Sequence, residues 1–389
     1  MNQKKLFLLF FFVAAFLQSN AQWSNHSFVY QTKTRSYRVY VPASYNVSNP
    51  ASMVVTLHGL GDNMTNFSTL GFNYIADTAN IIVVVPQAID DPLLASVYGV
   101  GNGTAWNSGA GFSGYYPNST VDDVGFLNAL IDTIKANYAI VQSRVYMCGF
   151  SMGGFMTERM ALQSNTEIAA FASMSGTFGS AITTYAPGRS VPIAHFHGTS
   201  DSTVYYHGDL YGIDPDSLIN FWVLNNGSNP FPDSMRYTDA VNDTITVDRF
   251  EYSGSTPDQD VWFFRMNGAG HTLLYQPVND ITEIYEAWLF FIRHKNNTAG
   301  VETYKTLDNN VQVYPNPATN FVDVFLPQTK NETLRVELFS MEGACLYNQP
   351  ATGAMVQIAL DDAKFANGIY ILRVLGNSVN FSQRIMIQK

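Results

Sequence analysis

The chain has 389 residues, more than one ordinary domain contains, so its length favours two or three domains. Its 21 basic residues face 31 acidic ones, a net charge of −10 with no basic run, which argues against nucleic acid or an anionic membrane as a partner. Two cysteines, Cys148 and Cys345, are too few for a disulfide framework and are expected to be free or buried thiols.

The first 21 residues have the pattern of a secretory signal peptide. Lys4 and Lys5 precede an apolar run from Leu6 to Leu17, and Ser19 and Ala21 then place small residues at the two positions that a signal peptidase reads. An apolar run of about 12 residues is too short to span a membrane, which takes about 20. Residues 1–21 are therefore predicted to be a signal peptide, and the rest of the chain is expected to be secreted, either extracellular or at the cell surface.

Residues 22–295 alternate between apolar strands and amphipathic helices. Strands are predicted at 37–42, 53–57, 81–85, 145–148, 168–174, 191–196, 246–252 and 261–266, and helices at 67–78, 121–135, 155–162, 216–224 and 281–294. Continuous apolar strands that alternate with helices are typical of a mostly parallel sheet with helices on both faces. The segment 87–120 has no clear period and is rich in Gly, Asn, Ser and Tyr, so it is predicted to be a long functional loop.

One stretch of this domain has the pattern of a strand, a sharp turn and a helix. The turn contains Gly149, Ser151 and Gly153, with the serine at its tip. Such a tight turn strains the central residue and brings neighbouring backbone close, so small residues are needed on both sides. A glycine-rich turn without chemistry is the alternative.

A serine hydroxyl needs a nearby base to become a nucleophile, and that base needs an orienting acid. Ser151, Asp201 and His271 each follow the end of a predicted strand, in the chain order nucleophile, acid, base. Reactive groups gather beyond the carboxyl ends of parallel strands, so these three are predicted to form a catalytic triad. Asp209, Asp233 and Asp260 are alternative candidates for the acid of the triad, but only Asp201 closely follows a predicted strand.

Four other histidines carry weaker signals for a functional role. His58 precedes a glycine turn, where a structural hydrogen-bonding role is more common. His195 and His197 lie on one face of a strand and have metal-ligand spacing, but no third ligand with clear spacing lies nearby, so no metal site is predicted. His207 lies in a polar loop and is expected to be solvated.

The amides of Leu60 and Met152 are predicted to form an oxyanion hole. Leu60 lies in the glycine-containing turn after a strand, and Met152 begins the helix after Ser151. Trp106, in the long loop, is a candidate substrate contact, with core packing as the equal alternative.

The pattern changes after residue 295. Residues 296–310 are polar and are predicted to be a linker. Residues 311–389 contain short alternating segments at 321–325, 334–339, 356–360 and 369–374, which predict a small all-β sandwich.

Residues 23–295 resemble a family of secreted esterases that includes polyhydroxybutyrate depolymerases and feruloyl and acetylxylan esterases. The matching stretches are 37–42, 57–59, 105–107, 122–126, 149–154, 197–201 and 268–271. The resemblance implies an α/β-hydrolase fold, no cofactor, and Ser151, Asp201 and His271 as the triad.

Residues 311–389 resemble the C-terminal sorting domain of the type IX secretion system. The resemblance rests on residues 314–320, 367–370 and 384–389. It implies that the outer-membrane secretion machinery exports the protein and that the domain is removed afterwards. A carbohydrate-binding module is the alternative for this sandwich.

The expected function is that of a secreted serine esterase that acts through an acyl-enzyme. The expected substrates are polymeric: feruloyl or acetyl esters on plant cell-wall xylan, or alternatively polyhydroxybutyrate and related polyesters. A serine peptidase would use the same machinery. A glycan-binding protein that keeps the fold without catalysis is the alternative from a different class.

Overall fold

The computed structural model describes residues 22–94, 96, 103–111, 114–182, 187–296, 311–326, 333–340, 345–351, 353–376 and 380–389. The signal peptide prediction and nearly all of the linker prediction lie outside the described residues. The chain divides into two compact units between residues 300 and 301, and each is described by itself.

The first unit is built on a ten-stranded sheet with the order β1-β2-β4-β3-β7-β8-β9-β12-β11-β10. In that order the strands are β1 (Gln22–Tyr30), β2 (Lys33–Val41), β4 (Ile81–Pro86), β3 (Ala51–Leu57), β7 (Ile140–Phe150), β8 (Ala170–Met174), β9 (Ile193–Gly198), β12 (Val261–Asn267), β11 (Thr246–Tyr252) and β10 (Asp233–Arg236). Neighbouring strands are parallel from β4 to β12 and antiparallel toward both edges. The mostly parallel sheet predicted from the sequence is confirmed.

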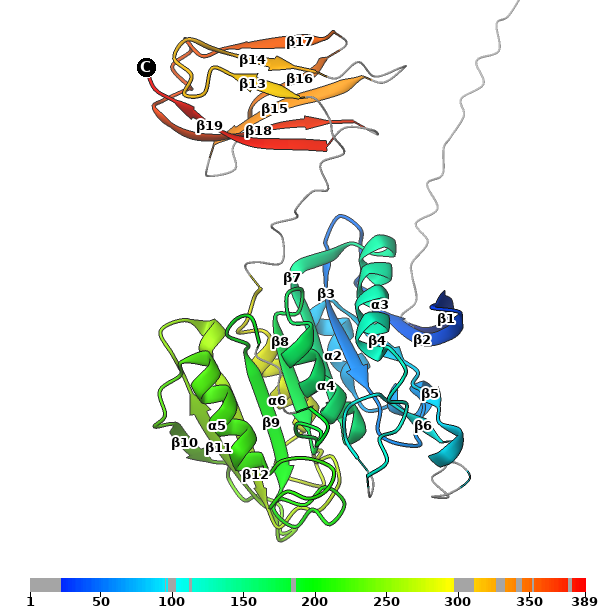
Figure 1. Cartoon of the computed structure of the whole chain (residues 1–389). Helices are drawn as coiled ribbons and strands as arrows, with labels where there is room; N and C mark the ends of the chain where they lie inside the picture. The colour runs from blue at the N-terminus through cyan, green and yellow to red at the C-terminus, as the bar shows by residue number, and fades with distance from the viewer. Residues whose placement is uncertain are drawn as a thin grey trace, which may run out of the picture. The chain divides into compact units, whose positions relative to one another are not determined.

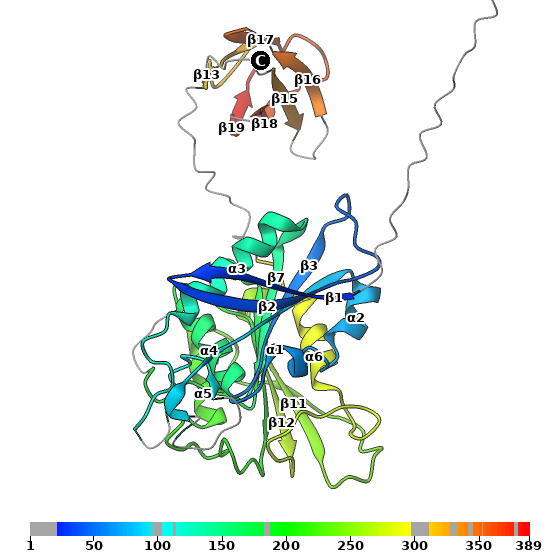
Figure 2. The ribbon, with the colours of Figure 1, turned by 90° about the vertical axis from the view of Figure 1, so that its right-hand side faces the viewer.

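Helices cover both faces of this sheet, as predicted (Figures 1 and 2). The helices on one face are α3 (Asp123–Asn137), α4 (Met152–Gln163) and α5 (Pro215–Asn226). On the other face lie α2 (Phe72–Ala79) and α6 (Glu283–Phe291). Successive residues of a strand point to opposite faces, so Val84 of β4 joins the first core while Val83 and Val85 join the second. This double burial explains why the strands read as continuous apolar runs.

One predicted helix differs from the observed structure. The sequence predicts a single helix over 67–78, but this segment holds the end of α1 (Met64–Phe67) and most of α2. Asn63 caps α1 by accepting hydrogen bonds from the amides of Thr65 and Asn66. Gly71, with φ of 117°, precedes α2 and turns the chain between the two helices. The remaining short elements of this unit are β5 (Ile89–Asp90), β6 (Thr104–Ala105) and the 3₁₀ turn η2 (Pro257–Gln259).

The second unit is an all-β sandwich, as predicted, and has more strands than the sequence suggested. One sheet has the order β13 (Gln312–Tyr314), β14 (Phe321–Phe325) and β17 (Met355–Ala359). The other has the order β16 (Cys345–Ala351), β15 (Leu334–Ser340), β18 (Gly368–Leu375) and β19 (Asn380–Ile387). Both sheets contribute to one core, with Val324 and Ile358 from the first and Leu338 and Leu372 from the second. The predicted segments correspond to β14, β15, β17 and β18.

Both cysteines are free thiols, as expected, with Cys148 buried and Cys345 exposed. Burial raises the pKa of the Cys148 thiol, because an apolar environment disfavours the thiolate. Among the residues that the structure describes, no helix combines the length and apolar character needed to span a bilayer.

Two glutamate side chains are completely buried in the first unit. Glu158 on α4 is 0% exposed, and Glu283 at the start of α6 is 1% exposed. Burial raises the pKa of each to about 8, because the charged carboxylate loses its hydration. In the unfolded chain both groups ionise near pH 4, so the folded protein holds two protons that the unfolded chain has released at neutral pH.

We expect the free energy of unfolding to fall as the pH rises from about 6.5 to about 8. The stability associated with each protonated glutamate is complete below its unfolded pKa and is lost as the pH rises through its folded pKa, at about 1.4 kcal/mol per pH unit and per group. Below about pH 6.5 a second effect acts. Burial lowers the pKa of His195 and of His294, so the stability that these neutral side chains contribute is present above about pH 6.5 and is lost as the pH falls further.

Denaturant unfolding of the wild type and of the Glu158→Gln/Glu283→Gln variant at pH 6.5 and pH 8 measures this effect. The amides keep the shape of the neutral acids and do not ionise, so the decline should be nearly absent in the variant. Glu167→Gln, at an exposed glutamate, is the control and should keep it. A wild-type free energy that does not change over this interval would contradict the expectation.

Candidate active site

The serine turn has the backbone that the sequence predicts. β7 ends at Phe150, α4 begins at Met152, and Ser151 between them has φ of 55° and ψ of −123°. This conformation is strained for a residue with a side chain. A Cβ added to Gly149 would collide with the carbonyl of Gly153, and one added to Gly153 would collide with the carbonyl of Leu57. Both glycines are therefore required for close packing of strand, turn and helix.

The structure brings the three predicted triad residues together. Ser151 follows β7, Asp201 follows β9 and His271 follows β12, and these parallel strands end at the same edge of the sheet (Figure 1). The Ser151 hydroxyl is 2.9 Å from His271 Nε2, and His271 Nδ1 is 2.7 Å from Asp201 Oδ2. With the Nδ1 proton donated to the carboxylate, Nε2 is left to accept the serine proton. The geometry is that of a nucleophile, a base and an orienting acid.

The acid is held by its own loop as well as by the histidine. Asp201 is 3% exposed, and its Oδ1 accepts hydrogen bonds of 2.8 Å from the amides of Thr203 and of Val204. Burial acts to raise the pKa of Asp201, but hydrogen bonds from His271 and from these two amides outweigh it and hold the pKa below its usual value. Asp201 therefore stays ionised at neutral pH beside His271.

A cavity of about 330 Å³ opens beside Ser151. Most of its lining is apolar, and one acidic residue, Asp62, also borders it. The lining consists of Gly59, Leu60, Asp62, Ala110, Phe150, Ser151, Met152, Phe155, Thr203, Val204, Tyr211 and His271. An apolar cavity that contains a nucleophile and a few polar groups is typical of a small-molecule site.

Leu60 and Met152, the predicted oxyanion-hole residues, both border this cavity. Met152 is the first residue of α4, and the first amides of a helix have no partner within it. Leu60 lies in the turn after β3. A Cβ added to Gly59 in the same turn would lie 3.8 Å from the Ser151 oxygen, so the backbone before Leu60 passes close to the nucleophile. Both positions are consistent with the predicted role of their amides.

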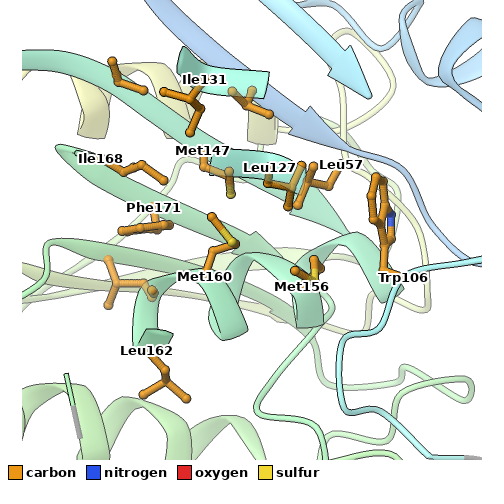
Figure 3. Packing of buried hydrophobic residues seen from close by; sticks show 14 of the residues in the cluster. Leu57, Trp106, Leu127, Ile131, Met147, Met156, Met160, Leu162, Ile168 and Phe171 are labelled. Carbon is orange, nitrogen blue, oxygen red and sulfur yellow. The ribbon is translucent and has the colours of Figure 1, made fainter. Parts of the chain in front are cut away.

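The side chain of Trp106 is buried outside the cavity lining, which contradicts its prediction as a substrate contact. Its side chain is 0% exposed and packs in the core near Leu57 and Met156 (Figure 3). Its indole N–H donates a 2.9 Å hydrogen bond to the carbonyl of His58. Trp106 is therefore a core residue, because the carbonyl of His58, just after β3, accepts the hydrogen bond of its indole N–H.

The four histidines considered above, His58, His195, His197 and His207, have structural partners or lie in solvent. His58 is buried, donates from Nδ1 to the carbonyl of Gly59 and accepts from the amide of Ala88, in agreement with its structural interpretation. His207 is exposed, as expected. His195 and His197 lie 3.2 Å apart, Nε2 to Nδ1. The described part of the chain holds no group of three or more His, Cys, Asp or Glu side chains placed to bind one metal ion.

The sequence prediction missed two acidic residues, Asp62 in the cavity lining and Glu158, which is buried on α4. Asp62 follows the glycine turn after β3, and its place among strand-exit residues was a usable signal. Glu158 lies three residues after Phe155 and four before Leu162, two buried residues of the same helix. An acidic residue on an otherwise apolar helix face was the available signal for a buried carboxyl group.

A stretch of each unit matches a known family model. Residues 45–210 match the family model described as Phospholipase/Carboxylesterase. Residues 312–388 match the model described as Secretion system C-terminal sorting domain. The first match includes Ser151 and Asp201, and the second covers the β-sandwich unit.

Several curated proteins are similar to the first unit. A bifunctional acetylxylan esterase/xylanase from Neocallimastix patriciarum is 27% identical over 260 residues, which are 65% of this chain and 33% of that protein. Feruloyl esterase D from Neurospora crassa is 28% identical over 267 residues, which are 67% of this chain and 82% of that protein. Among solved structures, an acetyl xylan esterase from Aspergillus awamori is 16% identical with a TM-score of 0.49, covering 69% of this chain and 99% of that one.

The sheet, the flanking helices, the serine turn and the two matches agree with one another. The chain thus combines an α/β-hydrolase unit, in which residues 45–210 match the phospholipase/carboxylesterase family model, with a β-sandwich unit that matches the model of a secretion-system sorting domain.

Proposed function

We propose that this chain is a secreted serine esterase that hydrolyses carboxylic esters through an acyl-enzyme. The observation that carries the proposal is the pair of hydrogen bonds, 2.9 Å and 2.7 Å, that link Ser151 to His271 and His271 to Asp201 beside the cavity. The named activities of the similar curated proteins, acetylxylan esterase and feruloyl esterase, support the same reaction class.

In the proposed mechanism, His271 Nε2 accepts the proton of Ser151 while the serine oxygen attacks the ester carbonyl. The amides of Leu60 and Met152 stabilise the negative charge that develops on the carbonyl oxygen. His271 then gives its proton to the departing alcohol, which leaves an acyl-serine. Water repeats the sequence with His271 as base and releases the acid. Asp201 holds the imidazole orientation and stabilises its charged form throughout.

We infer that feruloyl or acetyl esters on xylan are the substrates, on the strength of the names of the similar proteins. A panel of methyl ferulate, acetylated xylan, short p-nitrophenyl esters and a polyhydroxybutyrate film tests this. Release of ferulate or acetate from the first two, well above release from the polyester, is the expected result. Activity on the polyester alone would assign the polyester depolymerase alternative instead.

A fluorophosphonate probe separates an esterase from a glycan-binding protein with the same fold. The probe reacts with an activated serine, so it should label the wild-type protein and the Ser202→Ala variant but not Ser151→Ala. Ser202 is an exposed serine beside the acid and is therefore a matched control. An unlabelled wild-type protein would favour the non-catalytic alternative.

Asp62 is expected to select against esters with a negatively charged acyl group. Its position in the cavity lining puts a carboxylate near the bound substrate, where like charges repel in a medium of reduced dielectric constant. The ratio of kcat/KM for p-nitrophenyl hemisuccinate to that for p-nitrophenyl butyrate should rise about tenfold in Asp62→Asn, a change of about 1.4 kcal/mol. Asp239→Asn, at an exposed position outside the lining, is the control. An unchanged ratio in Asp62→Asn would remove Asp62 from substrate selection.

We propose that the sorting domain directs the esterase unit to the cell surface or the extracellular medium and is removed afterwards. The family match of residues 312–388 supports this role. A chain that ends at residue 310 should therefore remain inside the producing cell and keep its esterase activity in lysates. Equal amounts of both proteins in the medium would contradict the assignment.

A further inference from the structure

A chain of buried hydrogen-bonded groups runs from the serine helix to the acid loop. Glu158 on α4, Ser173 on β8, and His195 and His197 on β9 are each 0% exposed. Ser173 Oγ lies 2.5 Å from Glu158 Oε1 and 2.7 Å from His195 Nδ1. His195 Nε2 lies 3.2 Å from His197 Nδ1, and His197 Nε2 lies 2.9 Å from the carbonyl oxygen of Val204.

When every member of this chain is neutral, the carbonyl at its end sets the direction of each hydrogen bond. A carbonyl only accepts, so His197 Nε2 carries hydrogen, and in a neutral ring Nδ1 then accepts from His195 Nε2. His195 Nδ1 in turn accepts the hydroxyl proton of Ser173. The serine has a single proton, so its oxygen is left to accept from Glu158, which is possible only if that carboxyl group is protonated. The other oxygen of Glu158 accepts from the indole N–H of Trp222 at 2.9 Å.

If the protons of Glu158, Ser173 and His195 Nε2 each moved one step along the chain, Glu158 would become a carboxylate and His197, which keeps its Nε2 proton, would become an imidazolium. That arrangement places two separated charges in the dry interior. Burial raises the pKa of Glu158 to about 8 and lowers the pKa of both His195 and His197. The arrangement with no charge on any member is therefore the stable one at neutral pH.

His197 is placed where its charge would affect catalysis. Its Nε2 is 3.7 Å from Asp201 Oδ2, the same oxygen that accepts from His271. A charged His197 would compete with His271 for that carboxylate. The hydrogen bond to the Val204 carbonyl also braces the loop, because the amide of Val204 donates to Asp201 Oδ1. One ring thus contacts both the acid and the loop that orients it.

We propose that Glu158, Ser173 and His195 are positioning residues that keep His197 neutral, with its Nε2–H donating to the Val204 carbonyl. The Asp201 carboxylate then interacts with His271 without competition from a charged His197. The reaction served is the proposed esterase reaction, but the proton arrangement exists whether or not the protein is an esterase. It can therefore be tested without any substrate.

The first test is spectroscopic and uses the full chain labelled with ¹⁵N-histidine at neutral pH. His195 and His197 should both show a protonated Nε2 and an unprotonated Nδ1, assigned with the His195→Gln variant. Infrared spectra should show a protonated carboxyl C=O band that is lost in Glu158→Gln and kept in Glu167→Gln, a change at an exposed glutamate. A doubly protonated or Nδ1-protonated His197, or no difference in the carboxyl band, would overturn the proposal.

The second test asks whether a hydrogen-bond donor at position 158 is what matters. Glu158→Gln offers an amide N–H to Ser173 in place of the acid O–H, so kcat should stay within about threefold of wild type. Glu158→Leu removes the donor and should lower kcat about tenfold with KM within about twofold, because one buried hydrogen bond of the chain is lost and the tautomer of His197 is released. Equal kcat in the leucine and glutamine variants would contradict this role. If the leucine variant does not fold, the wild-type spectra decide.

Discussion

Ser151→Ala should lower kcat by about 10⁶-fold, a loss of the size found when the nucleophile of such a triad is removed. The hydroxyl is the group that forms the proposed acyl-enzyme, and it lies 2.9 Å from His271 Nε2, the proposed base. Alanine leaves His271 with no hydroxyl at this position to activate. Alanine keeps the Cβ, so the strained turn between β7 and α4 is retained. Hydrolysis of p-nitrophenyl butyrate, with far-ultraviolet circular dichroism as a check of folding, measures the effect.

Ser202→Ala is the matched control for this experiment, since it removes an exposed hydroxyl next to Asp201 without touching the nucleophile. Its kcat should remain near that of the wild type. A Ser151→Ala protein that folds and still turns over ester at more than about one hundredth of the wild-type rate would refute the assignment of the nucleophile.

Asp201→Asn should lower kcat by about 10⁴-fold, as the same change does in a serine protease triad. The reason lies in the acid loop of this chain. The amides of Thr203 and Val204 both donate to Oδ1, so the carbonyl oxygen of an asparagine would take that position. Its NH₂ group would then face His271 Nδ1 and donate to it. The Nε2 of His271 would carry the proton and could no longer accept one from Ser151.

The expected signature is a large fall in kcat with little change in KM, because the aspartate does not border the cavity. Asp239→Asn, at an exposed position, should leave kcat unchanged and serves as the control for loss of one negative charge. If Asp201→Asn retained wild-type kcat, another group would have to orient His271, and the proposed role of the acid would fail.

The candidate site could be predicted from the sequence largely because its residues stand at strand ends. Ser151, Asp201 and His271 each follow an apolar run, and the ends of parallel strands meet at one edge of the sheet. Ser151 and His271 are 120 residues apart and Asp201 and His271 are 70 residues apart, yet the order of strands in a parallel sheet was enough to predict that they meet. The glycines on either side of Ser151 indicated the tight turn for a local reason, since no side chain fits there.

Trp106 and Glu158 show why other parts could not be predicted. Whether Trp106 faces substrate or core depends on the carbonyl of His58, which comes from another segment of the chain. Glu158 lies in a helix that forms as expected, but its protonation depends on Ser173 and on Trp222, 15 and 64 residues away. The local sequence pattern does not predict which group from a distant segment will form a hydrogen bond with a buried polar atom.

By itself, the sequence determined the alternation of strands and helices, the second β-rich unit and the residues that stand at strand ends, since hydrophobic period and turn chemistry act over a few neighbouring residues. Only the tertiary structure decided that Trp106 is a core residue, that Asp62 borders the cavity and that a line of buried polar groups leads from Glu158 to the acid loop. Those outcomes depend on packing between distant segments, because burial removes water and leaves each polar atom dependent on the partner that the fold brings to it.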